Sequence, residues 1–214
     1  MNLLILAANG QISQLVEHRI FNEPQFKDVH LTLGLRNSSR LANLQKQARI
    51  LEVDLANAQD VEQAVAGQDL VFVGVVDRTP NNVITKNVIA AMKKHHVPRV
   101  IFANILGLYN EVGGEFGRWN HERVLPGLQS AINSDQLLSD SGLQYTTLRL
   151  PWLNDRNEIK YTITTHNQPY NGVCASRQSI ADVILQIVIN PSLFVNESIG
   201  IADPDTQGEN RPLY

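Results

Sequence analysis

The sequence has little cysteine, few aromatic residues and no strong excess of either charge. Cys174 is the only cysteine among 214 residues, so an internal disulfide is excluded and a reducing compartment is expected. The net charge is −3, from 18 basic and 21 acidic side chains. Because the Lys and Arg residues are scattered and form no basic stripe, we do not expect binding to nucleic acid.

Long apolar runs are also missing. No stretch approaches the roughly 20 residues that a membrane-spanning helix needs, and the apolar start at residues 3–8 has no basic leader. We therefore expect neither a membrane span nor a signal peptide, and we expect a cytoplasmic location. His18, His30 and His166 lack metal-ligand spacing with a cysteine or a second histidine, so no metal site is expected.

Strand-like and helix-like segments alternate along most of the chain. The strands are expected at residues 3–8, 29–35, 50–53, 69–76, 100–103 and 145–150, with further strands at 159–164 and 198–201. Helices are expected over 12–20, around 41–44, and over 60–65, 80–92, 130–139 and 176–188. Near-continuous apolar strands separated by amphipathic helices are typical of a parallel sheet covered on both faces. The pattern predicts a single α/β domain of the Rossmann type, with a doubly wound parallel sheet.

Within this single domain we expect two halves and a tail. Residues 1–110 form the dinucleotide-binding half, residues 111–202 form the substrate-side half, and residues 203–214 form a polar surface tail. The segment 111–127 is rich in Gly, aromatic and polar residues, and we predict no regular element there.

The first predicted strand runs directly into a tight turn and a helix. The turn has the spacing of a glycine-rich dinucleotide-binding loop, in which only the middle glycine, Gly10, is present and the small residues Ala7 and Ser13 occupy the outer positions. A glycine is needed in the middle because a diphosphate approaches the backbone there. The alternative is an ordinary strand–helix turn that happens to contain Asn-Gly. Gly10, Gln11 and Ile12 are predicted to hold the diphosphate, and Ala7 and Asn9 are further predicted cofactor contacts.

The end of the second strand bears on which dinucleotide is bound. An acidic residue here usually grips the adenosine ribose of NAD, but this position falls near Arg36 and no carboxylate lies between residues 35 and 40. A guanidinium suits a 2′-phosphate, with Ser38, Ser39 or Arg40 as helpers, so NADP is favoured over NAD. The alternative is a solvated arginine at a strand end.

Two later strand ends supply further predicted cofactor contacts. Asp54 and Leu55 suit the adenine, although Asp54 also suits a simple turn. Gly74 and Val75 are expected as a wall beside the nicotinamide-side ribose, and they could equally belong to the core.

Taken in order, several short segments resemble the atypical short-chain dehydrogenase/reductase group, specifically its NmrA-like and NAD(P)H-binding members. The matching segments are residues 7–12, 53–55, 68–74, 98–102, 106–109, 141–150 and 176–177. The resemblance implies a Rossmann-type fold with NADP or NAD at the carboxyl ends of the strands, where Pro151 would pass the nicotinamide. It does not fix the substrate, because the group includes quinone and flavin reductases as well as catalytically silent redox sensors.

The proton relay of the wider superfamily is absent from this sequence. That relay pairs a Tyr with a Lys four residues later, and none of the five tyrosines has such a lysine. Hydride transfer to a flavin or quinone can take its proton from solvent, so a reductase remains compatible with the sequence. Epimerase and alcohol dehydrogenase activities become less plausible.

The remaining polar and aromatic candidates follow the fifth strand. Asn104, which also falls among the predicted cofactor contacts, Tyr109 and His121 are the candidate catalytic side chains, although a lone histidine is more often solvated. The predicted substrate pocket consists of Tyr109, Trp119, Asn120 and Trp152, although large aromatics are more often core.

Three hypotheses follow for the function. The first is an NADPH-dependent reductase acting on a small planar acceptor such as a flavin or a quinone. The second is a non-catalytic NADP-responsive sensor, and the third is a scaffold that binds no nucleotide. The sequence leaves the acceptor and the choice between monomer and homodimer open.

Overall fold

An eight-stranded sheet forms the centre of the computed structural model, which describes all 214 residues. Its strands lie in the order β3-β2-β1-β4-β5-β6-β10-β8, and every neighbouring pair is parallel except β10 and β8. The strand bounds are β1 Asn2–Leu6, β2 His30–Leu35, β3 Arg49–Glu52, β4 Leu70–Val73, β5 Arg99–Ile105, β6 Gln144–Leu150, β8 Thr162–Thr164 and β10 Glu197–Ala202. The predicted Rossmann-type α/β fold is therefore confirmed.

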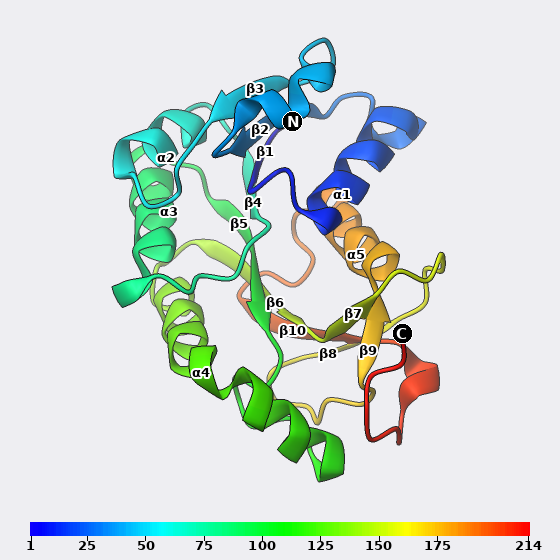
Figure 1. Cartoon of the computed structure of the whole chain (residues 1–214). Helices are drawn as coiled ribbons and strands as arrows, with labels where there is room; N and C mark the ends of the chain where they lie inside the picture. Colours follow the sequence, from blue (N-terminus) through cyan, green and yellow to red (C-terminus); the bar gives the residue numbers. More distant parts are fainter.

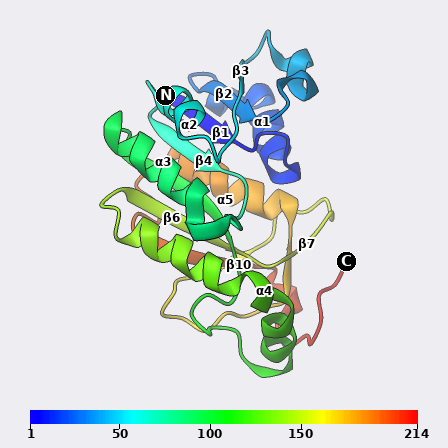
Figure 2. The ribbon, with the colours of Figure 1, turned by 60° about the vertical axis from the view of Figure 1, so that its left-hand side comes forward.

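Five α-helices cover the two faces of this sheet (Figure 1). Helices α1 (Gln11–Asn22) and α5 (Arg177–Ile189) pack together on one face. Helices α2 (Ala58–Val65), α3 (Val83–Lys94) and α4 (Gly114–Ser139) cover the other, where α3 and α4 lie side by side (Figure 2). Short 3₁₀ helices occur at Pro24–Phe26, Ser38–Leu44, Pro80–Asn82 and Pro204–Thr206. None of the helices combines the length and the apolar character needed to cross a membrane.

Alternation along the strands divides the core into two layers. In β1, Leu3 and Ile5 pack towards α1 and α5, whereas Leu4 and Leu6 pack towards α2 and α3. All four side chains are fully buried, as expected for a strand in the middle of a parallel sheet with helices on both faces. The layers hold the carboxyl ends of the strands together at one edge of the sheet.

That edge contains the point where the strand order reverses. From β1 the chain moves outward through β2 and β3, and it then returns to β4 on the other side of β1. In open α/β sheets, ligands bind at the crevice beyond the strand ends at such a reversal. We therefore expect a ligand site at the loops that follow β1 and β4.

The structure differs from the sequence prediction in the second half of the chain. The segment 111–127, for which no regular element was predicted, enters α4 at Gly114, and α4 continues to Ser139 through Pro126. Glycine and proline are poor helix formers, and so the residue pattern of this segment does not predict a helix. Two strands were also missed, β7 (Trp152–Asn154) and β9 (Cys174–Ser176), which pair in parallel as a separate small sheet and are too short to show a pattern.

Candidate nucleotide-binding site

The turn between β1 and α1 leaves a helix N-terminus open at the reversal point. Gly10 is the N-cap residue of α1 in an extended conformation, and no side chain caps the helix. Uncapped N–H groups and the positive end of the helix dipole together form a site for an anion. Ser13 links the first turn of α1 to the loop before it, because its Oγ donates a hydrogen bond to the carbonyl oxygen of Ala7 at 3.3 Å.

Two small residues allow this turn to pack against β4. Ala7 adopts a left-handed backbone conformation with φ of 60°, which glycine accepts more readily than alanine does. Gly74, directly after β4, lies so close to the turn that a Cβ there would come within 2.5 Å of the Oγ of Ser13. Gly74 therefore serves close packing between the two strand ends rather than flexibility.

A cleft of about 630 Å³ opens beyond the ends of these strands, and we call it the strand-end cleft. Its volume lies in the range of small-molecule sites. Six of the predicted cofactor contacts border it, namely Ala7, Asn9, Arg36, Asp54, Leu55 and Val75. One carboxylate oxygen of Asp54, Oδ1, accepts from the backbone N–H of Ala56 at 3.0 Å, so this side chain also shapes its own turn.

A smaller polar hollow of about 300 Å³ adjoins the strand-end cleft at the end of β2, and its lining contains no apolar side chain. Asn9, Arg36, Asn37 and Arg40 line it. Arg36 and Arg40 form no ion pair within the chain, so two guanidinium groups remain available to a ligand. The arrangement suits an anion with several oxygens, because guanidinium groups bind phosphate in a two-pronged geometry.

The loop between β4 and α3 carries a further arginine, Arg78, which the sequence analysis did not single out. Its neighbour Asp77 is buried and accepts from the N–H and hydroxyl groups of both Thr79 and Thr85. The hydroxyl of Thr79 in turn accepts from the backbone N–H of Val83 at 2.9 Å. Arg78 thus extends from an anchored loop. A polar stretch directly after a buried strand was the signal that could have identified it.

Arg78 also borders a second pocket, of about 350 Å³, between α4 and the ends of β5 and β6. We call this the α4 pocket. Three residues that sequence reasoning placed in the cofactor or substrate site border it, namely Asn120, Pro151 and Trp152. The amide of Asn120 is fixed in the wall, since it accepts from Trp152 Nε1 at 3.0 Å and donates to the carbonyl oxygen of Leu106 at 3.3 Å.

Other predicted residues of this half lie outside the α4 pocket. Asn104 is buried, and its side chain donates to the carbonyl oxygen of Ala131 and accepts from the N–H of Ile105, so its amide is used within the fold. His121 is exposed on α4, and its side chain makes no hydrogen bond. Trp119 stands behind the wall, against Trp152 at 4.8 Å between ring centroids.

Tyr109 likewise borders neither opening. Its hydroxyl donates to the carboxylate of Asp135, and its ring lies 5.5 Å from the guanidinium carbon of Arg149. Burial, together with the hydrogen bond to Asp135, raises the pKa of the phenol well above its usual range. The phenol therefore stays protonated, and its proton is donated to Asp135 even though Tyr109 is 40% exposed.

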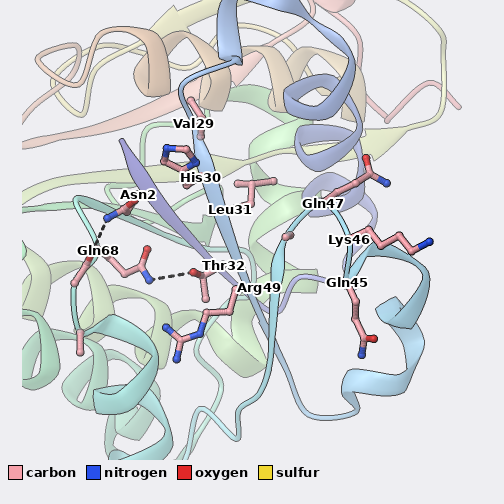
Figure 3. Close-up of a pocket in the computed structure, with 13 residues that line it drawn as sticks. Asn2, Val29, His30, Leu31, Thr32, Gln45, Lys46, Gln47, Arg49 and Gln68 are labelled. Atoms are coloured by element: carbon pink, nitrogen blue, oxygen red, sulfur yellow. Dashed lines mark hydrogen bonds between the residues drawn. The ribbon is translucent and has the colours of Figure 1, made fainter.

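Another hollow of the surface lies at the opposite edge of the sheet, where β1, β2 and β3 begin (Figure 3). Its volume is about 710 Å³, and Asn2, His30 and Arg49 are among the mainly polar residues around it. Figure 3 shows the side chain of Gln68, which also borders the hollow, pointing towards Thr32, to whose hydroxyl it donates at 3.1 Å. No helix N-terminus or strand-order reversal faces the hollow, and so we assign the site to the other edge, where the strands end.

Comparison with known proteins identifies the family of the chain. A family model described as NAD(P)H-binding matches residues 7–191, which include the turn after β1 and six of the eight strands of the sheet, all but β1 and β10. The chain belongs to this NAD(P)H-binding family. The match begins at Ala7, the first residue of the turn that presents the helix N-terminus.

Solved structures of other NAD(P)H-binding and related proteins share the whole fold. A wide-type short-chain dehydrogenase/reductase from Veillonella parvula, in complex with NADP, superimposes with a TM-score of 0.91 at 25% identity and covers 100% of this chain and 99% of its own. A Rossmann-fold NAD(P)-binding family protein from Shigella flexneri is 31% identical, with a TM-score of 0.76 and coverage of 100% and 98%. An anaerobilin reductase from Escherichia coli O157:H7 has the same fold at 18% identity, with a TM-score of 0.78 and coverage of 96% and 98%.

Proposed function

We propose that the protein is an NADPH-dependent reductase that acts on a planar acceptor such as a flavin or a quinone. One observation carries the proposal, namely that Arg78 borders both the strand-end cleft and the α4 pocket. A dinucleotide held at the first opening can therefore present its reactive ring to a second molecule in the next. NADPH, when bound, supplies a hydride from its nicotinamide ring.

The residues at the strand-end cleft fit NADP. The free N–H groups at the start of α1 suit the diphosphate, and Gly10 leaves the backbone open to it. The hollow beside Arg36 and Arg40 suits the 2′-phosphate that distinguishes NADP from NAD. The complex of the Veillonella parvula protein with NADP gives further support.

The α4 pocket then has the task of orienting the acceptor. The pocket has an apolar lining from Ile105, Leu106 and Leu150. The Trp152 ring is held in place by the hydrogen bond from its Nε1 to Asn120. Holding two reactants in a fixed orientation supplies much of the rate when the chemistry needs no protein-bound acid. No Tyr, His, Lys, Asp or Glu borders the pocket. The overall reaction is NADPH + acceptor + H⁺ → NADP⁺ + reduced acceptor, with the proton coming from water.

The same lack of an acid favours one alternative, a non-catalytic sensor that binds NADP and alters a protein partnership. The two functions differ in turnover. Purified protein should oxidise NADPH in the presence of FMN, riboflavin or 1,4-naphthoquinone, followed at the absorbance of NADPH, and more slowly with NADH. NADPH binding in calorimetry without turnover on any acceptor would favour the sensor, and no binding of either nucleotide would rule out both functions.

A further inference from the structure

The α4 pocket carries an excess of positive charge. Of its lining side chains, Arg78 and Arg123 are cationic and none is acidic. Neither arginine takes part in an ion pair anywhere in the chain, whereas other arginines such as Arg19, Arg149 and Arg177 do. Unpaired guanidinium groups beside an apolar pocket attract an anionic group of a ligand.

Arg123 is held in place by an aromatic surface. Its guanidinium carbon lies 4.1 Å from the centroid of the Trp119 ring, one helical turn earlier on α4. Trp119 is itself packed between Phe116, at 5.9 Å, and Trp152, at 4.8 Å between ring centroids. The stacked guanidinium keeps its N–H groups free at its edge, because the cation–π contact uses only its face. Arg123 thus presents donors at the rim of the α4 pocket.

Arg78 has a different position. Its loop is anchored by Asp77 and Thr79, and it borders the strand-end cleft as well as the α4 pocket. A cation at this junction can serve the nucleotide, the acceptor or both. Of these two openings, Arg123 borders only the α4 pocket. Its charge therefore acts on the acceptor and not on the nucleotide.

We infer that the acceptor is anionic: a planar, mostly apolar ring system whose phosphate or carboxylate arm binds Arg123, with Arg78 adding positive potential. This inference rests on the proposed function and names its substrate class. Neutral flavins and quinones would fill the apolar part of the pocket and leave Arg123 unused. The sequence alone did not reveal this charge, because Arg78 and Arg123 are far apart in the chain.

Matched neutral and anionic compounds test the inference. FMN and riboflavin share one ring and differ by a phosphate, and 1,4-naphthoquinone can be compared with its 2-carboxylate. We expect KM for FMN to be at least about tenfold below that for riboflavin, as charge-assisted hydrogen bonds allow. The advantage should shrink as salt is added, and the naphthoquinone carboxylate should likewise have a lower KM than the neutral quinone.

Arg123→Gln should remove the preference by raising KM for FMN about tenfold while leaving KM for riboflavin unchanged. Arg123→Lys, which keeps the charge without the planar fork, should retain part of the preference. Arg118→Gln is the matched control, because Arg118 is an exposed arginine of the same helix that borders neither opening. It should behave as the wild type with both flavins.

Flavin fluorescence in the presence of NADP⁺ measures binding independently of turnover. Arg123-dependent binding of FMN without NADPH oxidation would overturn the proposed reductase while supporting an anion-selective pocket. NADPH oxidation with equal KM for FMN and riboflavin, or equal effects of the Arg118 and Arg123 variants, would leave the reductase standing and overturn the anionic acceptor.

Discussion

Arg149 and Glu111 form an ion pair that is completely enclosed in the fold. Arg149 Nη1 donates to Glu111 Oε1 at 2.7 Å, and the side chains are 0% and 2% exposed. The Glu111 carboxylate also accepts from the backbone N–H groups of Gly107 and Tyr109. Because Gly107 follows Leu106 directly, the pair fixes the loop that leads from β5 to the wall of the α4 pocket.

Removing one partner of this pair should strongly destabilise the protein. Arg149→Met leaves a buried carboxylate without its cation, and we expect a loss of about 3–5 kcal/mol in the free energy of unfolding, measured in urea. Arg177→Met is the control, because Arg177 pairs with Asp155, whose side chain is 78% exposed. The double variant Arg149→Met, Glu111→Gln should recover part of the loss. Equal effects at the two arginines would contradict this account.

The left-handed conformation of Ala7 predicts a substitution that increases the stability of the protein. Ala7→Gly removes the strain of a Cβ at φ of 60°, which is about 1–2 kcal/mol. This gain in stability exceeds the entropic cost of ordering glycine, which is more flexible in the unfolded chain. We expect a net increase of up to about 1 kcal/mol in urea unfolding, with NADPH binding retained.

Gly142→Ala is the converse control for Ala7→Gly. Gly142 has φ of +77°, and a Cβ there would meet no neighbouring atom, so only backbone strain is added. It should lower the stability by about 1 kcal/mol. A stability loss in Ala7→Gly would show that the methyl group contributes packing rather than strain.

Much of the fold could be predicted from the sequence because it rests on local pattern. Apolar strands buried on both faces, such as β1 and β4, read as continuous runs, and the turn around Gly10 follows the first of them. The position of Arg36 beside that turn follows from the parallel pairing of β1 with β2, which brings both strand ends to one edge. The strands and the turn need no information from distant residues, and the pairing of β1 with β2 follows from the fold class.

The acceptor side could not be predicted to the same extent. Asn104 was expected to face a ligand, but whether an amide at a strand end faces outward depends on the helix that packs over it, here through Ala131 of α4. Trp119 was expected as a pocket wall and instead supports Arg123. Such roles arise from contacts across α4, a helix that Gly114 and Pro126 hide from sequence patterns.

The hollow beside β2 predicts how the protein distinguishes the two nicotinamide dinucleotides. Arg36→Ala should weaken NADPH binding about 10- to 100-fold in calorimetry, the loss expected for charge-assisted hydrogen bonds to a phosphate, and NADH binding should change little. Arg49→Ala is the control, because Arg49 borders the hollow at the opposite edge of the sheet. A parallel loss for both dinucleotides would contradict the role of Arg36 in reading the 2′-phosphate.

A buried carboxyl group on α1 predicts the pH dependence of stability. Glu17 is 2% exposed with Oε1 unpaired, and burial raises its pKa from 4.5 to about 8. The folded state therefore binds this proton more tightly than the unfolded state does. The contribution of this proton to the free energy of unfolding is fully present below about pH 4.5. It is lost as the pH rises towards 8, by at most about 1.4 kcal/mol per pH unit.

Glu17→Gln tests this assignment because glutamine keeps the shape and cannot ionise. Urea unfolding of the variant should show higher stability than the wild type at about pH 8, with the difference shrinking towards pH 5. Glu209→Gln, at an exposed position of the tail, should keep the wild-type pH profile. If the Glu17 variant kept that profile too, another group would have to be responsible.

The hydrogen bond between Tyr109 and Asp135 predicts that this tyrosine is not a proton donor in turnover. Tyr109→Phe leaves a buried carboxylate without its donor, and we expect about 1–3 kcal/mol lower stability. Its kcat with FMN should stay far from the roughly 100-fold loss that removal of a general acid causes. Tyr161→Phe is the matched control, since the Tyr161 hydroxyl donates to Asp182 at 2.8 Å on α5, away from both openings. A large fall in kcat confined to the Tyr109 variant would instead identify Tyr109 as the acid that replaces the missing relay.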